Sequence, residues 1–398
     1  MAYKKGSKYE ITVKAPTQLL KPLTVPTKTL TGPGPSNCSN RVLKSLGNQL
    51  LGHLHAETIQ LMDEIKLGIQ YIFQTRNRLT LAVSASGHGA MEASLGNILE
   101  AGETILIVVN GFWGERAINM ASRLAGVTVR SIRSEPGIPI DLRQLEESLK
   151  EHKPDVVFMV HGESSTGMRQ PLEGFGDMVH KYGGLLIVDT VVTIGSEPFF
   201  MDDWSIDVVY TGSQKVLGAP PGLSPISFSL LAERKIFSRK TTVPVFYWDM
   251  TLLGEYWGCF DKPRTYHHTI SATLVYGLRE ALARIAEEGL EASWSRHKTA
   301  GKILKRGLAL RGLQCFVKNS EYQLNGLVSI ELPPGVDGKL VCEYAMKKYK
   351  VEISGGLGPT NGKVLRIGLL GVNASGKRIG SIFRALDDGL RNSSKSKL

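Results

Sequence analysis

The 398-residue chain has few cysteines and no long apolar run. Its four cysteines lie far apart and form no C-x-x-C pair, which argues against structural disulfides and against a cysteine-bound metal. No apolar stretch approaches the ~18 residues that a membrane-spanning helix needs. The polar residues 1–10 lack the apolar core of a secretory signal. These absences predict an intracellular protein that binds no metal and does not cross a membrane.

Positive charge is in excess but is not gathered in one segment. The chain has 48 lysines and arginines against 37 aspartates and glutamates, a formal net charge of +11. Such an excess suits nucleic acid, an acidic surface or a pocket for small anions. The basic residues are scattered, and no RNA-binding or helix-turn-helix signature accompanies them. Nucleic acid is therefore not an expected partner.

From about residue 80, short aliphatic runs alternate with amphipathic stretches. Strands are expected at residues 81–84, 105–109, 127–132, 156–160, 185–188, 208–210 and 226–228. Helices are expected at 90–99 and 141–152, and Asp141 and Gln144 are spaced as in a capping box. The alternation predicts an α/β fold with a mostly parallel central sheet and helices on both faces. In such sheets ligands bind at the carboxyl ends of strands.

The chain is expected to divide into four parts. Residues 1–25 carry prolines between polar residues and lack a sustained period, which predicts an extended N-terminal arm. Residues 26–284 are expected to form a large α/β domain. Residues 285–391 are expected to form a smaller α+β domain, with strands at 328–332 and 364–369. Residues 392–398 are a short polar tail, which is expected to be mobile.

The first strand is followed by a segment with the character of an anion site. Ser86, Gly87, His88 and Gly89 stand there, directly before a helix pattern. Small residues at a helix start expose backbone N–H groups toward one point, where the helix dipole also favours an anion. The segment predicts a phosphate seat, although a glycine-bearing turn without a ligand is an equal alternative for this element alone. No P-loop or G-x-G-x-x-G pattern is present, so nucleotide sites are not indicated.

Three further strand ends carry other chemical groups. Trp113 follows the second strand, Asp189 ends a wholly apolar strand, and Lys215 follows the strand at 208–210. Taken alone, a tryptophan at a strand end ordinarily belongs to the hydrophobic core. A lysine in a loop is ordinarily exposed to solvent. The carboxylate is less ordinary, because its burial is costly without a counter-charge and no neighbour in sequence supplies one. A bound ligand is a candidate source of the positive charge that would pair with Asp189.

Together these groups fit one cofactor. A single sheet edge is predicted to present an anion seat, a flat aromatic ring, a buried carboxylate and a lysine. Pyridoxal 5'-phosphate needs each of them: a cradle for its phosphate, a ring to stack on, an acid that keeps its pyridine nitrogen protonated, and an amine that joins its aldehyde. The sequence therefore predicts an enzyme that uses pyridoxal 5'-phosphate.

Between residues 28 and 373 the chain resembles the alanine–glyoxylate (serine–pyruvate) aminotransferases, a class-V family of fold type I pyridoxal-phosphate enzymes. The motifs that carry the resemblance are GPGPSN at 32–37, SGH at 86–88, HGESSTG at 161–167, GSQK at 212–215, YHHT at 266–269 and GGLGPT at 355–360. The resemblance implies a ping-pong transamination that moves the amino group of alanine or serine to glyoxylate. Alanine would give pyruvate, and glyoxylate would give glycine.

The resemblance also implies a role for particular residues. Lys215 would carry the cofactor and Asp189 would bind its pyridine nitrogen, which makes these two the expected catalytic residues. The other residues expected to line the cofactor are Ser86, Gly87, His88, Trp113, Ser164 and Gln214. A homodimer is implied, in which Tyr266 and Thr269 reach the phosphate of the neighbour's cofactor and the N-terminal arm wraps the partner subunit.

Arg366 completes the expected site. It lies in a strand pattern with leucine and isoleucine on the opposite face. A half-buried guanidinium needs an anion. A structural salt bridge would serve, but the resemblance favours a two-pronged contact with the α-carboxylate that amino-acid and 2-oxo-acid substrates share. Gly34, in the motif at 32–37, is also expected beside the substrate.

Three other functions are also compatible with parts of the sequence. A kynurenine or 3-hydroxykynurenine transaminase is the nearest alternative, but insect enzymes of that kind have Ser-Asn in place of Gly52 and His53 and alanine in place of Gly87. A cysteine desulfurase would place a histidine directly before the lysine, where this chain has Gln214. A cofactor-free binding protein would be colourless, so an absorbance scan separates it from any pyridoxal enzyme.

The last three residues match a peroxisomal import signal. Ser396, Lys397 and Leu398 form a tripeptide that an import receptor reads as an address. A chance basic tail is the alternative, but the polar lead-in and the presence of glyoxylate in peroxisomes favour the signal. A peroxisomal location, with a role in glyoxylate detoxification, is therefore expected.

Overall fold

The computed structural model describes residues 12–393. The first eleven residues of the expected arm and the expected import signal at 396–398 lie outside the described residues. Within residues 12–393, no helix is both long enough and apolar enough to cross a bilayer.

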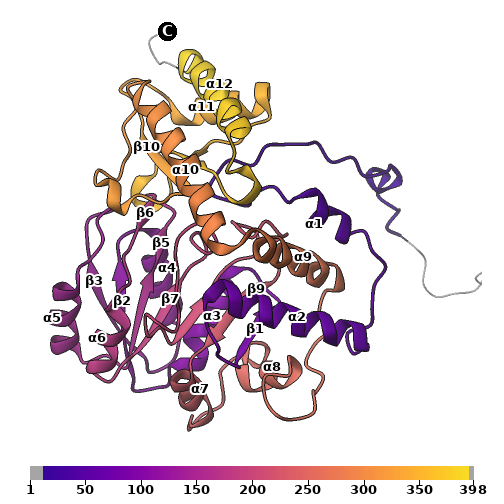
Figure 1. The fold of residues 1–398 in the computed structure, drawn as a ribbon, viewed down its shortest axis with the longest axis vertical. Coiled ribbons are helices and arrows are strands. Elements are labelled where there is room, and N and C mark those ends of the chain that lie inside the picture. Colours follow the sequence, from indigo (N-terminus) through magenta and orange to yellow (C-terminus); the bar gives the residue numbers. More distant parts are fainter. Residues whose placement is uncertain (1–11, 394–398) are drawn as a thin grey trace, which may run out of the picture.

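A seven-stranded sheet lies at the centre of the large domain (Figure 1), with the strand order β1-β9-β8-β7-β4-β2-β3. Its strands are β1 (Thr80–Val83), β2 (Thr104–Val109), β3 (Thr128–Arg133), β4 (Val156–Val160), β7 (Leu185–Asp189), β8 (Val208–Tyr210) and β9 (Ser224–Phe228). β9 pairs antiparallel with both β1 and β8, and the other pairs are parallel. Six of the seven strands therefore run in one direction, which confirms the predicted mostly parallel sheet.

Helices flank this sheet (Figure 1). They are α1 (Asn40–Ser45), α2 (Ala56–Phe73), α3 (Gly87–Ile98), α4 (Phe112–Ala121), α5 (Leu142–His152), α6 (Phe175–Lys181), α7 (Leu230–Phe237), α8 (Met250–Tyr256) and α9 (Ala272–Glu288). The helices α3 and α4 pack against each other and against the sheet, as do α5 and α6. The fold is thus α/β, as predicted.

Local sequence signals explain where two of these helices begin. At the start of α5, Asp141 Oδ1 accepts the Gln144 N–H at 2.8 Å and Gln144 Oε1 accepts the Asp141 N–H at 2.9 Å, so the predicted capping box is confirmed. The helix α3 begins at Gly87, three residues before the expected start at residue 90. The small residues that were expected to form a turn therefore form the first helical turn.

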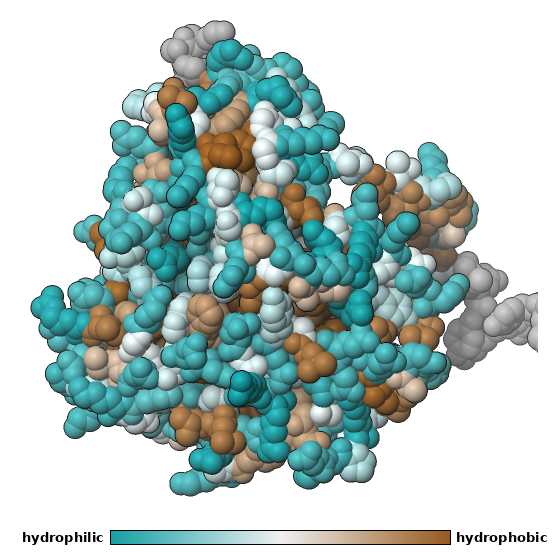
Figure 2. Space-filling view, viewed as in Figure 1, coloured by the Kyte–Doolittle hydropathy of each residue, from teal (hydrophilic) through white to brown (hydrophobic). Residues whose placement is uncertain are grey.

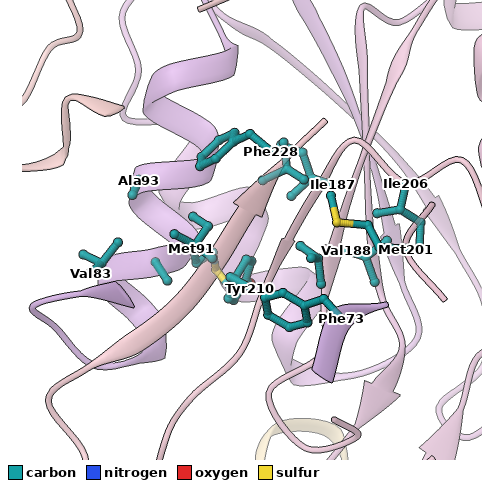
Figure 3. Packing of buried hydrophobic residues seen from close by; sticks show 14 of the residues in the cluster. Phe73, Val83, Met91, Ala93, Ile187, Val188, Met201, Ile206, Tyr210 and Phe228 are labelled. Atoms are coloured by element: carbon teal, nitrogen blue, oxygen red, sulfur yellow. The ribbon is translucent and has the colours of Figure 1, made fainter. Parts of the chain in front are cut away.

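The core lies between the sheet and its helices. All five residues of β4 are buried, as expected for a parallel strand that is covered on both faces. Figure 3 shows how the layers meet: Met91 of α3 lies close to Tyr210 of β8, and Phe73 of α2 lies close to Val188 of β7. This packing holds the strand ends in fixed relative positions.

A smaller unit follows in the sequence. Its three-stranded sheet has the order β10-β12-β11, formed by β10 (Leu327–Glu331), β12 (Val364–Gly368) and β11 (Ser354–Gly355), and its helices are α10 (Leu290–Ala309), α11 (Gly338–Tyr344) and α12 (Gly376–Asn392). Its buried side chains form a separate hydrophobic cluster. Residues 29–32 hydrogen-bond to this unit, for example through Thr29 N–H to Lys350 O at 2.8 Å. The domain boundaries at residues 25, 284 and 391 stay predictions.

Short elements complete the chain. They are the hairpin β5 (Gly162–Glu163) and β6 (Met168–Arg169), the 3₁₀ turns η1 (Thr17–Leu20), η2 (Phe246–Trp248), η3 (Ser320–Tyr322), η5 (Gly358–Thr360) and η6 (Gly371–Asn373), and the π-helical turn η4 (Ala345–Tyr349).

The described part of the N-terminal arm stretches away from the body of the molecule (Figure 1). Figure 2 shows a mostly hydrophilic face on the body, with apolar residues gathered on this segment. Its exposed apolar side chains are Val13, Leu19, Leu20, Leu23 and Val25. Such side chains are costly to leave in water, so a second surface is expected to cover them.

Candidate active site

A cavity opens at the sheet edge where the parallel strands end. The empty space in it measures about 550 Å³, part of which is open to solvent. The side chains and backbone of Ser86, Gly87, His88, Met91, Trp113, Gly162, Ser164, Asp189, Val191, Val192, Gln214 and Lys215 line it. Eight of the twelve predicted site residues are in this lining. Gly34, Arg366, Tyr266 and Thr269 are not.

The predicted phosphate seat lies at the first turn of α3. Ser86 is the N-cap residue, and Gly87 and His88 occupy the first helical positions. The first N–H groups of a helix lack the usual partner four residues earlier, so they can bind an anion. Here the Gly89 N–H donates to Ser86 O at 2.8 Å, which leaves the N–H groups of Gly87 and His88 for such a ligand. A Cβ on Gly87 would lie 3.2 Å from Val191 Cγ2. Glycine therefore keeps room at the seat.

Trp113 is fixed at two points. Its backbone N–H donates to Glu163 Oε2 at 3.0 Å, and its indole Nε1–H donates to Ser164 Oγ at 2.7 Å. The His88 ring packs edge-on against it, with centroids 5.4 Å apart. These contacts hold the indole in one orientation at the cavity wall, as a stacking surface requires.

Asp189 ends β7 and is 4% exposed. Its Oδ1 accepts the Val191 N–H at 2.8 Å, and its Oδ2 accepts the Tyr210 hydroxyl at 2.7 Å. Burial raises the pKa of this carboxyl to about 6, against the effect of the two hydrogen bonds and of the Lys215 charge. Among residues 12–393 no cation lies within ion-pair distance of Asp189. A ligand that carries a cation would supply the missing counter-charge.

Lys215 follows β8 and extends into the same cavity. Its Nζ donates to Pro33 O at 2.6 Å. Burial and the nearby charge of Arg366 lower the pKa of this amine to about 8, and Asp189 opposes the shift. A cavity amine with a lowered pKa is suited to covalent chemistry and to proton transfer near neutral pH.

Gly34 lies against Lys215, although it was expected beside the substrate. Its φ is +105°, and a Cβ at this position would fall on the lysine side chain. Both observations require glycine here. The structure therefore connects Gly34 with the placement of the amine, and its contact with substrate stays a prediction.

Arg366 lies on β12 and is 7% exposed. Its Nε–H donates to Gly355 O at 2.8 Å, and its Nη1 donates to Ser164 O at 3.1 Å. No carboxylate of the described chain lies within ion-pair distance, so the structural salt bridge considered as an alternative is not formed there. Burial lowers the pKa of this guanidinium, and the charges of Glu163 and Glu352 oppose that shift. Arg366 is thus held by carbonyl groups and remains available to an anion.

Tyr266 and Thr269 lie apart from the cavity of their own chain. The Tyr266 side chain is 58% exposed, and its hydroxyl lies 3.3 Å from Thr269 Oγ1. This placement suits residues that act on a neighbouring subunit. Their contact with a partner's cofactor stays a prediction.

Two further ionisable residues near the cavity were not singled out from the sequence. Glu163 is buried and accepts the N–H groups of Trp113 and Ser165, and burial raises its pKa. Its place in the motif at 161–167 was the only feature of the sequence that could have marked Glu163 as a site residue. Tyr210 pairs with Asp189 across β7 and β8, but strand pairing cannot be read from a single sequence.

Residues 36–373 match the family Aminotransferase class-V. The chain belongs to the class-V aminotransferases. This confirms the predicted family, and with it the predicted enzyme class of transaminase and the dependence on pyridoxal 5'-phosphate.

Relatives cover almost the whole chain. The alanine–glyoxylate aminotransferase of Callithrix jacchus is 48% identical over 390 residues, which are 98% of this chain and 94% of the relative. The enzyme of the same name from Drosophila melanogaster is 48% identical over 382 residues, 96% of this chain and 97% of the relative. The crystal structure of alanine–glyoxylate aminotransferase from Nostoc sp. superposes with a TM-score of 0.93 at 43% sequence identity. The match covers 96% of this chain and 100% of that chain.

The residues around the cavity fit the cofactor of this family. The first turn of α3 offers N–H groups for a phosphate, Asp189 lacks a cationic partner within the described chain, and Gln214 Oε1 is buried without a hydrogen-bond partner. An orphaned buried amide is costly unless a bound group satisfies it. The individual contacts of these residues with the cofactor stay predictions.

Replacing Asp189 with asparagine is expected to stabilise the cofactor-free protein at pH 7 and to lower kcat by about 10²-fold or more, since a charge aimed at the reacting centre is lost. The carboxyl releases its proton near pH 4 when unfolded and near pH 6 when folded. Between these values the folded wild type binds more protons, so its stability falls as pH rises. The gain for the variant therefore grows across this window to about 3 kcal/mol.

Denaturant titrations of both cofactor-free proteins from pH 4 to pH 8 measure this difference. A stability difference that does not change with pH would contradict the assigned carboxyl environment.

Proposed function

We propose that this protein is an alanine–glyoxylate aminotransferase. The observation that carries the proposal is the near-complete coverage of the curated relatives of that name at 48% identity. The cavity supports it, since an amine, a buried carboxylate and an anion seat meet at one sheet edge, and the Arg366 guanidinium donates to Ser164 O of the cavity lining. The expected reaction gives pyruvate and glycine from alanine and glyoxylate, or uses serine as the donor.

Pyridoxal 5'-phosphate, when bound, supplies an aldehyde that joins an amine and a ring that withdraws electrons. The chain's own residues then have separate tasks. Lys215 Nζ accepts a proton from the substrate Cα and later returns one, which its lowered pKa near 8 allows close to neutral pH. Asp189 would hold the ring nitrogen and would keep a negative charge beside it. Trp113, fixed by Glu163 and Ser164, covers the reacting face and excludes water.

Arg366 is proposed to bind the substrate α-carboxylate. Its Nη1 contact with Ser164 O places the guanidinium next to the cavity lining. The lining itself contains one lysine and no arginine. A second substrate carboxylate would therefore lack a counter-charge, which favours short monocarboxylic 2-oxo acids such as glyoxylate over dicarboxylic ones.

The kynurenine alternative is not favoured. Gly87 lines the cavity, and the alanine expected of those enzymes would bring a methyl group to 3.2 Å from Val191 Cγ2. The other departure, at Gly52 and His53, lies outside the cavity lining. The His53 ring instead packs near Tyr266, at 4.9 Å between centroids.

A panel of acceptors tests the proposal. With alanine as donor, glyoxylate is expected to give the highest kcat/KM, and 2-oxoglutarate is expected to be about 10²-fold poorer, because an uncompensated carboxylate costs several kcal/mol. Serine and 3-hydroxykynurenine serve as alternative donors in the same assay. A preference for 2-oxoglutarate, or for 3-hydroxykynurenine over alanine, would contradict the proposed specificity.

The proposed assembly is a homodimer. The exposed apolar side chains of the arm and the exposed position of Tyr266 support it. In this assembly Tyr266 and Thr269 complete the partner's cofactor site. Hybrid dimers test the arrangement: a Lys215→Ala subunit paired with a Tyr266→Ala subunit is expected to contain one fully wild-type site and one doubly damaged site, and a hybrid with no activity would contradict it.

We also propose import into peroxisomes through Ser396, Lys397 and Leu398. Removal of Leu398 is expected to leave activity unchanged and to leave the protein in the cytosol. Import that persists without Leu398 would contradict this assignment.

A further inference from the structure

Two adjacent histidines form a chain of hydrogen bonds that ends beside the phosphate seat. His267 Nε2 lies 3.3 Å from Phe246 O, and His267 Nδ1 lies 2.9 Å from His268 Nδ1. At the other end, His268 Nε2 lies 2.6 Å from Ser84 Oγ. Ser84 directly follows β1 and stands two residues before Ser86, the N-cap of α3. These hydrogen bonds therefore connect the segment before α9 with the turn that precedes the phosphate seat.

One carbonyl group fixes the hydrogen positions in this chain. A carbonyl oxygen only accepts, so His267 Nε2 carries a hydrogen and donates to Phe246 O. In a neutral imidazole the other nitrogen then accepts, which makes His267 Nδ1 the acceptor and His268 Nδ1 the donor. His268 Nε2 is left without a hydrogen. Its only role is to accept the hydroxyl hydrogen of Ser84.

The surroundings favour the neutral form of His268. Tyr247 of η2 and Tyr256 of α8 pack against its ring, at 5.1 and 5.4 Å between centroids. Burial lowers its pKa to about 4. Residues 12–393 contain no group of three histidine, cysteine or acidic side chains arranged for a metal.

The turn before α3 is held at two neighbouring points. His268 holds Ser84 through its side chain, and Ser224 Oγ of β9 donates to Ala85 O at 3.0 Å. Ala85 in turn packs closely against Gly89 in the first turn of α3. A change at Ser84 therefore bears on the backbone whose N–H groups form the seat.

We propose that His268 is a positioning residue of the phosphate seat, acting as the fixed acceptor that orients Ser84. The inference rests on the proposed function, because the seat is assigned through the cofactor. His267 and His268 also stand between Tyr266 and Thr269 in the sequence. The same segment would then set the geometry of its own seat and carry the residues offered to the partner's site.

A matched pair of variants tests this role. The amide of glutamine reaches the position of His268 Nε2 and can accept from Ser84, whereas the shorter amide of asparagine reaches only the position of Nδ1. The readout is the dissociation constant of pyridoxal 5'-phosphate, measured by titration of the cofactor-free dimer. His268→Asn is expected to weaken binding about tenfold, the value of one hydrogen bond, and His268→Gln to stay within about threefold of wild type.

Further measurements separate positioning from general stability. Ser84→Ala is expected to match His268→Asn, and the double variant should lose no more than either single one. The KM for alanine should stay unchanged, because Arg366 is not affected. Equal binding by the glutamine and asparagine variants would overturn the proposal.

If His268→Asn does not fold, the wild type still decides the matter. Nitrogen-15 NMR of the imidazoles is expected to show hydrogen on Nε2 of His267 and on Nδ1 of His268. The opposite tautomer at His268 would overturn the inference. A wild-type protein that binds no pyridoxal 5'-phosphate would instead overturn the proposed function, so the two failures are distinguishable.

Discussion

Replacing Lys215 with alanine is expected to lower kcat by about 10⁴-fold or more, because one amine serves both covalent attachment and proton transfer. The structure places this amine in the cavity with a pKa lowered to about 8. No other lysine lines that cavity within the described chain. The visible absorbance of the covalently attached cofactor is also expected to disappear. Steady-state kinetics and an absorbance scan measure the two effects.

A nearby lysine provides the control for this experiment. Lys28 is exposed, lies outside the cavity and comes before the motif at 32–37. Lys28→Ala is expected to keep both the absorbance and kcat. An alanine variant at position 215 that retained colour and turnover would remove Lys215 from the mechanism.

Replacing Arg366 with leucine is expected to lower kcat/KM for alanine by about 10²- to 10³-fold, mainly through KM. The reason is that the substrate carboxylate would enter a desolvated site without its counter-charge, a loss of about 3–4 kcal/mol. Arg366→Lys should lie between the leucine variant and the wild type, since it keeps the charge but not the two-pronged geometry. Kinetics with alanine and glyoxylate measure both variants.

A substrate without a carboxylate separates binding from structural damage. The leucine variant also leaves Gly355 O and Ser164 O without their donor, which can disturb the site. Ethylamine lacks the carboxylate, so its slow reaction is expected to be almost equal in wild type and in Arg366→Leu. A similar loss with alanine and with ethylamine would show that Arg366 supports the fold rather than the substrate.

The sequence predicted those parts of the fold that depend on local pattern. The apolar run at 156–160 became β4 with the expected bounds, and Asp141 and Gln144 formed their capping box. The start of α3 was placed three residues too late, because Gly87 is a poor helix former and was interpreted as part of a turn. The antiparallel direction of β9 was not foreseen, since an apolar run carries no information about direction.

The site residues likewise fall into those that a local pattern predicts and those that only the fold brings together. Trp113, Asp189 and Lys215 follow separate strands, and the rule that parallel strands end at one edge was enough to bring them together. The partner of the Asp189 carboxylate was only half foreseen: a ligand was expected, and the Tyr210 hydroxyl was not. The contact of His268 with Ser84 spans 184 positions, and no local pattern marks such a pair.

Peptide mapping after borohydride reduction shows directly whether Lys215 holds the cofactor covalently. The hydride converts a carbon–nitrogen double bond into a stable single bond, so the cofactor stays on the lysine that carried it. A phosphopyridoxyl group is expected on the peptide that contains Lys215. A label on a different lysine, or no label on a protein that still transaminates, would contradict it.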